Sequence, residues 1–443
     1  MTDYGAPGVY VQEVPSGPRP ITGVGEAVAG FLGVAPDHNA LVMEAVPIDN
    51  WTQFVNNYVG DARAGTDLSS AVYGFFANQG TRCYVVNLGD DGSLEGTAHQ
   101  TGGLQLLEAI DEVAIVAAPG YHDLASYVAL QAHCEAPTQQ DRVAILDPPP
   151  APRDSKGEVD KQAVRDQIER LVVVASEPPA PDPAPSPPAP KPPTAAEDSG
   201  SGGGTHGRGT AAAAAGTKAG GLRPPQSDGG YSTFYFPWLR MRCPISGDII
   251  SAPPSGHMAG IWARSDATRG VHKAPANEQV LNVLDVEYPV SRTEQEYLNP
   301  GRVNCIRSFP ASGLRVWGAR TLADPASEWR YINVRRLTNM LKESIQDGTQ
   351  WVVFEPNSYQ LWAEIRRDVG AFLTRVWEDG ALVGASADEA FFVKCDAETN
   401  PPEVRDVGQL VTEIGIAPVK PAEFVVFKLM QSTLTGSATA VGG

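Results

Sequence analysis

The stretch VAIVAAPG at 113–120 is a continuous apolar run that ends in two residues which interrupt regular structure. Such a run is typical of a strand that is buried on both faces, because neither face carries polar side chains. A helical pattern over 121–134 separates it from a second buried run, RVAILD at 142–147. Strands that alternate with helices predict an α/β domain with a mostly parallel sheet.

A second unit is predicted near the C-terminus, from two amphipathic helices that flank a short apolar strand. The first helix is expected over 324–348, where it begins with Asp-Pro and ends at a glycine, and the second over 357–380. Proline is favoured in the first turn of a helix, where its missing N–H has no partner to lose, and glycine is favoured just after the last turn. With the strand WVVF at 351–354, these helices predict a compact α+β unit.

The composition is that of a globular protein with two or three domains. Of the 443 residues, 42% are hydrophobic and 19% are charged. The five cysteines are scattered singly, so we expect reduced thiols. The formal net charge of −18 argues against nucleic-acid binding, which needs clustered Lys and Arg. The start of the chain does not resemble a signal peptide, and no apolar run reaches the roughly 20 residues of a membrane span, so we expect a cytoplasmic protein.

A stretch rich in Pro, Ala and Gly interrupts the pattern at 177–230. It begins with EPPAPDPAPSPPAPKPP and later contains five consecutive alanines at 211–215. This composition cannot bury enough apolar surface to offset the entropy cost of ordering the chain. We therefore expect a surface excursion, whose simplest interpretation is tolerated length.

Each end of the chain carries an isolated strand pattern. VYVQEV at 9–14 lies between prolines, and EFVVFKLM at 423–430 is apolar on both faces. A strand that is apolar on both faces has to be paired in a sheet. The two ends either pair within their own subunit or complete a sheet in a neighbour, and the residues alone leave both interpretations open. The predicted arm residues are Val9, Tyr10, Val11, Val14, Phe424, Val425, Val426, Phe427 and Leu429.

Four polar residues lie close enough in the sequence to suggest a hydrolase, namely Ser255, His257, Asp266 and His272. A Ser-His-Asp site is defined by its geometry, however, and no G-x-S-x-G elbow is present. The segment PPSGHMAG at 253–260 is better interpreted as a tight turn. The sequence also lacks a P-loop, a dinucleotide-binding glycine pattern and a histidine metal motif, so we expect no catalytic, cofactor-binding or metal-binding residues and no enzyme activity.

Two pairs of arginines stand out in this acidic chain. Arg335 and Arg336 lie on the first C-terminal helix, and Arg366 and Arg367 lie on the second. One interpretation is a solvated helix face on which the arginines have local acidic partners. The other is an electrostatic contact with an acidic partner protein.

The chain also carries a series of short motifs in a fixed order. They are PGVYVQE (7–13), FFANQG (75–80), YFPW (235–238), PPSGHMAG (253–260), ARSD (263–266), RGVHKAPAN (269–277), LNP (298–300), VWGARTL (316–322), NVRRL (333–337), FEPN (354–357), GALVG (380–384) and PVKPAEF (418–424). These motifs resemble those of the contractile tail sheath family of phage tails and phage-tail-like injection systems. The resemblance covers about the whole chain except 150–230.

This resemblance implies a structural subunit rather than an enzyme. Such subunits polymerise as stacked hexameric rings around an inner tube, exchange their terminal arms, and contract without a cofactor to drive the tube through a target envelope or membrane. The implied partners are further copies of the chain, the inner tube protein, and baseplate and tail-terminator or cap proteins, with no nucleic acid and no membrane insertion. Assembly is expected in the cytoplasm, with release on lysis.

In fold class, the resemblance implies a multi-domain α/β and α+β subunit with extended β-arms. The expected parts are an N-terminal arm (1–22), an outer α/β domain (23–150 with 231–305), a helix followed by the surface excursion (151–230), an inner, tube-facing α+β domain (306–420) and a C-terminal arm strand (421–443). Both arginine pairs are then candidates to face the tube. Two alternatives stay open here: an α/β hydrolase that uses Ser255 and His257, and a monomeric α/β binding module.

Overall fold

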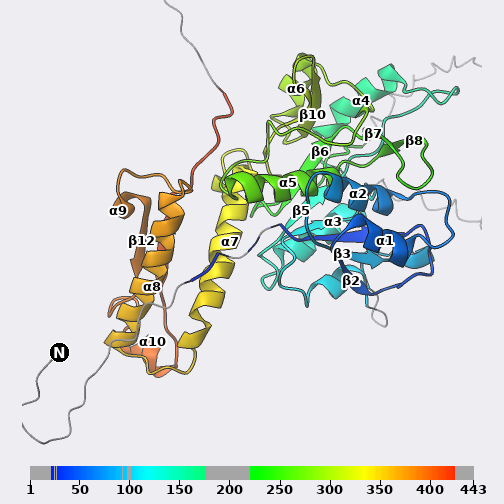
Figure 1. The fold of residues 1–443 in the computed structure, drawn as a ribbon. Helices are drawn as coiled ribbons and strands as arrows, with labels where there is room; N and C mark the ends of the chain where they lie inside the picture. The colour runs from blue at the N-terminus through cyan, green and yellow to red at the C-terminus, as the bar shows by residue number, and fades with distance from the viewer. Residues whose placement is uncertain are drawn as a thin grey trace, which may run out of the picture.

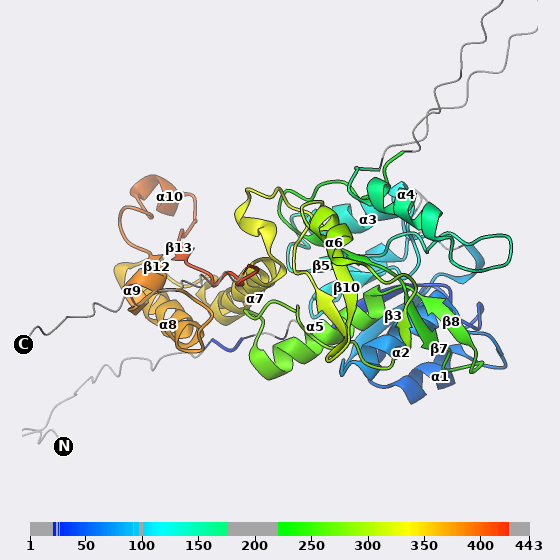
Figure 2. The same cartoon turned by 90° about the horizontal axis from the view of Figure 1, so that it is seen from above.

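The computed structural model describes residues 21–23, 25, 27–91, 93–96, 101–175 and 220–424. These residues form a large α/β domain and a smaller, mainly helical unit (Figure 1). The two units meet where helix α5 (Ser255–Arg269) of the domain approaches helix α7 (Ile332–Thr349) of the unit (Figure 2). Several predicted features lie outside the described residues, namely the Pro-rich stretch up to residue 219 and the arm residues Val9, Tyr10, Val11, Val14, Val425, Val426, Phe427 and Leu429.

An eight-stranded sheet forms the centre of the α/β domain. In spatial order its strands are β11 (Gly313–Trp317), β10 (Asn304–Phe309), β6 (Ser232–Phe236), β5 (Val143–Leu146), β4 (Ile115–Ala117), β1 (Ala29–Gly33), β3 (Cys83–Asn87) and β2 (Ala45–Ile48). The strands from β10 to β3 run parallel, and the two edge strands β11 and β2 pair antiparallel. The mostly parallel sheet predicted from the apolar runs is therefore confirmed.

Both faces of the sheet are buried, which explains why its strands lack polar positions. On β5, Val143 and Ile145 point to one core, and Ala144 and Leu146 point to the other. One face is covered by α1 (Trp51–Tyr58), α2 (Asp67–Ala77) and α5. The other face is covered by the 3-10 turn η2 (Leu104–Leu107), α3 (Leu124–Glu135), α4 (Lys161–Leu171) and α6 (Arg292–Leu298). A small antiparallel sheet of β7 (Leu239–Arg242), β8 (Ile249–Ala252) and β9 (Asp285–Val286) adjoins the domain.

The helical unit has its own core between two long helices and a two-stranded antiparallel sheet. Helix α7 packs against α8 (Tyr359–Glu378), and strands β12 (Phe391–Lys394) and β13 (Glu413–Ile416) lie against α8. Short elements complete the unit and its connections: η3 (Glu328–Arg330), η4 (Gln350–Val352), α9 (Ala387–Ala390) and α10 (Pro402–Asp406). In the part of the chain that is described, no helix combines the length and the apolar character that crossing a bilayer requires.

The prediction of a tight turn at 253–260 is wrong, because this segment begins α5. Its glycines allow α5 to approach α2 very closely, and a Cβ atom on Gly256 would lie only 2.2 Å from the carbonyl oxygen of Ala71. Tertiary packing of small residues therefore outweighs the local turn signals. The two prolines come just before the first helical residue, Ser255, a place in which proline is tolerated.

Three further expectations differ from the structure. The helix expected from 324 begins at Ile332, because residues 331–332 pair with 319–320 beside the sheet. The expected strand at 351–354 is a 3-10 turn followed by a loop, in which Phe354 is fully exposed and has a φ of 68°. The α/β sheet also extends to Trp317, beyond the expected domain boundary at 305.

Candidate functional site: the junction of the two units and the roots of the terminal segments

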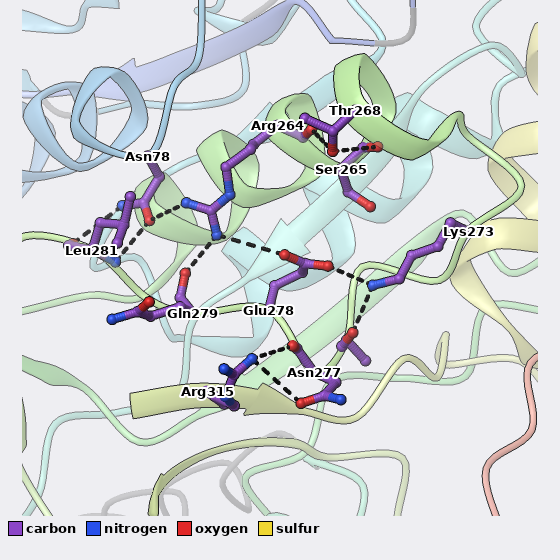
Figure 3. Close-up of polar contacts among 11 residues, drawn as sticks. Asn78, Arg264, Ser265, Thr268, Lys273, Asn277, Glu278, Gln279, Leu281 and Arg315 are labelled. Carbon is purple, nitrogen blue, oxygen red and sulfur yellow. Dashed lines mark hydrogen bonds and ion pairs between the residues drawn. The ribbon is translucent and has the colours of Figure 1, made fainter. Parts of the chain in front are cut away.

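A polar network holds the loop that contains the motif at 269–277 (Figure 3). Within the loop, Lys273 Nζ lies 2.6 Å from Glu278 Oε1. From α5, Arg264 Nη2 donates to the carbonyl oxygen of Gln279 at 2.5 Å. The loop is thus tied to the helix whose C-terminus it follows.

The same network joins this loop to α2 and to the edge strand β11. Asn78, which ends α2, accepts a hydrogen bond on Oδ1 from the backbone N–H of Leu281 at 2.9 Å. Arg315 of β11 donates from Nη1 to the carbonyl oxygen of Asn277 at 2.7 Å (Figure 3). The motif residues therefore hold α5 in place against α2 and β11. Helix α5 in turn contacts α7 of the helical unit.

Arg336 forms the ionic contact between α7 and α5. Its Nη1 and Nη2 atoms donate to Asp266 Oδ1 and Oδ2 at 2.9 and 2.6 Å, and its guanidinium lies 4.8 Å from the ring centroid of Trp262. The side chains of Arg336 and Asp266 are only 1% and 8% exposed. Since Trp262 and Asp266 both belong to α5, this single arginine fixes the start of α7 on that helix.

Arg335 is buried beside the same junction. Its guanidinium lies 4.1 Å from the ring centroid of Trp329 and 4.5 Å from that of Tyr231, and its Nε donates to Asn339 Oδ1 at 2.9 Å. Neither the solvated helix face nor the tube-facing role predicted for Arg335 and Arg336 holds, because both side chains are buried inside the subunit. Their partners lie up to 106 residues away in the sequence, so the helix pattern alone did not reveal them.

The second arginine pair lies on α8 and is less buried. Arg367, whose side chain is 40% exposed, contacts Asp368 Oδ1 at 3.0 Å. Arg366 donates from Nη1 to the carbonyl oxygen of Cys395. Neither contact tests the predicted role of this pair in binding an acidic tube surface, which stays a prediction.

The N-terminal segment is rooted in the helical unit. Ile21 is 1% exposed and belongs to the core of that unit. Arg375 of α8 donates from Nη2 to the carbonyl oxygen of Ile21 at 2.6 Å. Gly348 of α7 leaves the space that Ile21 fills, since a Cβ there would lie 2.6 Å from Ile21 Cγ1. The chain then continues to β1 in the α/β domain.

The C-terminal segment, in contrast, is rooted beside the α/β domain. The carboxylate of Glu423 accepts hydrogen bonds from Arg320 Nε at 2.9 Å, Arg320 Nη2 at 2.8 Å, Asn299 Nδ2 at 2.8 Å and the Tyr331 hydroxyl at 3.0 Å. We call these four residues the Glu423 clamp. Phe424, the next residue and the one predicted arm residue within the described part of the chain, is 74% exposed.

Strands β12 and β13, which are connected by residues 395–412 including α10, form a two-stranded antiparallel sheet that we call the β12–β13 hairpin, and among the described residues these strands pair only with each other. Phe391, Val393, Ile414 and Ile416 pack toward the core of the helical unit, whereas Phe392 is 57% exposed. A two-stranded sheet is marginal by itself, and its outer edges present unpaired backbone groups. Among the described residues, no third strand joins this sheet, although residues 381–383 pair with the chain just after β13.

The residues of the hydrolase alternative do not assemble into a Ser-His-Asp site. Ser255 Oγ donates directly to Asp147 Oδ2 at 2.6 Å, and Asp266 is engaged by Arg336. His257 is fully buried with its ring against Gly74, and its two ring nitrogens have no hydrogen-bond partner among the described residues. Burial lowers the pKa of His257 to about 4. Across the described ranges, no group of three or more His, Cys, Asp or Glu side chains is arranged to hold a metal ion.

The sequence analysis missed Ile21, Asp147 and the Glu423 clamp as structural determinants. In the sequence, Glu423 is the acidic first residue of the predicted strand at 423–430 and lies within the motif at 418–424. Its partners come from three segments that are 92 to 124 residues distant in the sequence. No periodic pattern connects segments so far apart.

Comparison with known proteins agrees with this architecture. Residues 227–322 match the phage tail sheath protein central domain, and residues 324–431 match the phage tail sheath C-terminal domain. The tail sheath protein of Burkholderia phage BcepMu is 30% identical over 184 residues, which are 40% of this chain and 37% of that protein. The chain spans less than half the length of the curated tail sheath proteins it matches.

Solved structures extend the similarity to nearly the full chain. The sheath complex of PVC, an extracellular contractile injection system, in its contracted state has a TM-score of 0.68 and 26% identity, over 98% of this chain and 99% of that chain. The 6-fold symmetrised baseplate of the anti-feeding prophage contains a chain with a TM-score of 0.64 and 26% identity, over 97% of this chain and 100% of that chain. These relatives and neighbours are structural proteins of sheaths and baseplates, not enzymes. Residues 227–322 and 324–431 are thus tail sheath domains, and the whole chain has the fold of the sheath subunits of contractile injection systems.

Proposed function

We propose that this chain polymerises as stacked hexameric rings around an inner tube and contracts to drive the tube through a target envelope or membrane. The observation that carries the proposal is the similarity, over 98% of the chain, to a subunit of a sheath complex in its contracted state. The 6-fold symmetry of the anti-feeding prophage baseplate supports rings of six subunits. Contraction would use free energy stored in the extended lattice, with rigid domains rotating about flexible connections, so no nucleotide is consumed.

In this proposal, the arm strands at 9–14 and, beyond Glu423, at 424–430 complete the β12–β13 hairpins of neighbouring subunits. The available hairpin edges and the exposed Phe392 support this arrangement. Each added backbone hydrogen bond contributes about 0.5–1.5 kcal/mol, and each buried apolar side chain about 1.5–3 kcal/mol. Association costs about 4–15 kcal/mol, so one arm binds weakly or moderately, and several arms per subunit hold the lattice through avidity.

The two units take different places in the proposed lattice. The helical unit, which corresponds to most of the inner domain expected over 306–420, faces the tube, and the α/β domain lies outside it. Arg366 and Arg367 are then the candidates for contact with an acidic tube surface, since Arg335 and Arg336 are buried. Further proposed partners are baseplate and terminator or cap proteins, and we place assembly in the cytoplasm.

The test is assembly of the full chain with its tube partner, measured by high-speed sedimentation, for three proteins: the wild type, a variant without residues 1–14 and a variant without residues 425–443. We expect the wild type to pellet as particles and both truncated proteins to stay in the supernatant, with an unchanged far-UV circular dichroism spectrum. Pelleting of both truncated proteins at the wild-type level would contradict arm exchange. A wild-type chain that stays monomeric with the tube partner would contradict the polymer itself.

A further inference from the structure

We propose that Glu423 determines where the C-terminal strand leaves the subunit, and that it transfers tension along this strand to the α/β domain. This inference rests on the proposed arm exchange and adds the residue that positions the arm. Without such an anchor, the residues just before the strand would adopt many conformations in the free subunit. They would have to be ordered when the strand binds to a neighbour, and the entropy cost would weaken binding.

The geometry of the Glu423 clamp fits an anchor. Its three partner residues come from three places: Asn299 follows α6, Arg320 follows β11, and Tyr331 precedes α7. Arg320 donates two parallel hydrogen bonds to the carboxylate, a geometry that is stronger and more directional than a single bond. One side chain therefore connects the C-terminal segment to both units.

The carboxylate is also partly shielded from water, with the side chains of Arg320 and Glu423 only 11% and 19% exposed. Burial by itself would raise the pKa of Glu423, but hydrogen bonds from Arg320 and Asn299 outweigh it and hold the pKa below its usual value. The clamp is therefore charged at neutral pH. In this setting, salt screens the pair less than it screens a fully exposed pair.

The position of the clamp along the chain matters as much as its geometry. Upstream, Val419 is fixed by its N–H, which donates to the carbonyl oxygen of Ala381, and by its own carbonyl oxygen, which accepts from Asn333 Nδ2 at 2.9 Å. Downstream, the exposed Phe424 is the first apolar residue of the arm strand. If the clamp opened, the four residues from 420 to 423 could move the root of the arm by up to roughly 13 Å, at about 3.3 Å per residue.

The plain alternative is that the clamp only stabilises its own subunit. Three variants separate the two interpretations: Glu423→Gln, Arg320→Gln and the double variant. Glu296→Gln is the matched control, because Glu296 forms an exposed ion pair with Arg292 on α6, close in sequence to Asn299. Tyr331→Phe removes one donor of the clamp and is the mildest change, should the others impair folding.

Three properties are measured on the full-length variants: the thermal unfolding temperature, chymotrypsin cleavage after Phe424 identified by mass spectrometry, and assembly with the tube partner. We expect Glu423→Gln to raise the rate of cleavage after Phe424 about tenfold or more, since local opening must precede cleavage. Tyr331→Phe should raise it less. The double variant should be no worse than the worse single variant, because the two residues act as one unit.

Assembly provides the readout that a purely structural role would not affect. We expect Glu423→Gln to reduce pelleted particles at least severalfold while its unfolding temperature stays close to that of Glu296→Gln. If removing residues 425–443 abolishes assembly but Glu423→Gln assembles like the wild type, the anchor is refuted and arm exchange stands. If removing residues 425–443 has no effect, exchange of the C-terminal arm is refuted, and the anchor with it.

Discussion

The buried ion pair between α5 and α7 gives the sharpest prediction about stability. In Arg336→Met, Asp266 keeps its buried position but loses both donors and is left as an unpaired charge. Breaking a buried pair in this way costs about 3–5 kcal/mol. The lost contact with the Trp262 ring adds about 0.5–2 kcal/mol. Since a whole domain is stable by only about 5–15 kcal/mol, we expect a large decrease in the free energy of unfolding.

The assay is urea unfolding of the full chain at concentrations where it is monomeric, followed by tryptophan fluorescence and far-UV circular dichroism. The double variant Arg336→Met with Asp266→Leu removes both charges and should recover most of the loss, because an apolar pair of similar volume often replaces a buried ion pair without cost. Arg292→Met, which removes an exposed pair, is the control and should change stability by less than about 1 kcal/mol. A loss below about 1 kcal/mol in Arg336→Met, or single losses that simply add in the double variant, would show that this ion pair does not stabilise the contact between α5 and α7.

Three further predictions follow from other parts of the molecule. Gly256→Ala should destabilise the α/β domain by about 1–3 kcal/mol, measured by the same unfolding experiment, because its Cβ would collide with α2; stability equal to the wild type would mean that the helices can separate freely. Burial raises the pKa of Asp147 to about 7, so its stabilising contribution is fully present below the usual pKa near 3.8 and is lost as the pH rises through 7. The free energy of unfolding should therefore fall between about pH 4 and pH 7, and Asp147→Asn should flatten this decline; an identical slope in the variant would contradict the assignment. Finally, reversing the charge of Arg366 and Arg367 together should weaken co-sedimentation with an acidic tube at low salt, and unchanged co-sedimentation would exclude this pair as the tube contact.

The α/β core was predictable from the sequence because its strands are short apolar runs, and both faces of the sheet are covered. The run at 113–118 contains β4, and the run at 142–147 contains β5, each with boundaries within two residues of the prediction. The prediction succeeded because it depends only on the strand's own residues. A strand that is covered on both faces must be apolar at every position, whichever elements pack against it.

The start of α5 and the burial of Arg335 and Arg336 were not predictable for the opposite reason. Pro and Gly at 253–256 locally favour a turn, and only the close approach of α2 makes a helix the better solution. A helical arginine pair is readily interpreted as a solvated face with local acidic partners, because the sequence does not show that Asp266 and Trp262 of a different helix pack against it. Similarly, the Glu423 clamp combines segments that no short-range pattern links.

The central claim, that this chain forms a contractile sheath, is tested most directly by electron cryomicroscopy of the full chain expressed with and without its tube partner. We expect hollow, helically striated cylinders with six subunits per ring, in which the segments at 9–14 and 424–430 of neighbouring subunits extend the β12–β13 hairpin into a larger sheet. Compact single particles in both preparations would contradict the polymer. Cylinders in which the hairpin remains two-stranded would contradict the proposed way in which the subunits are held together.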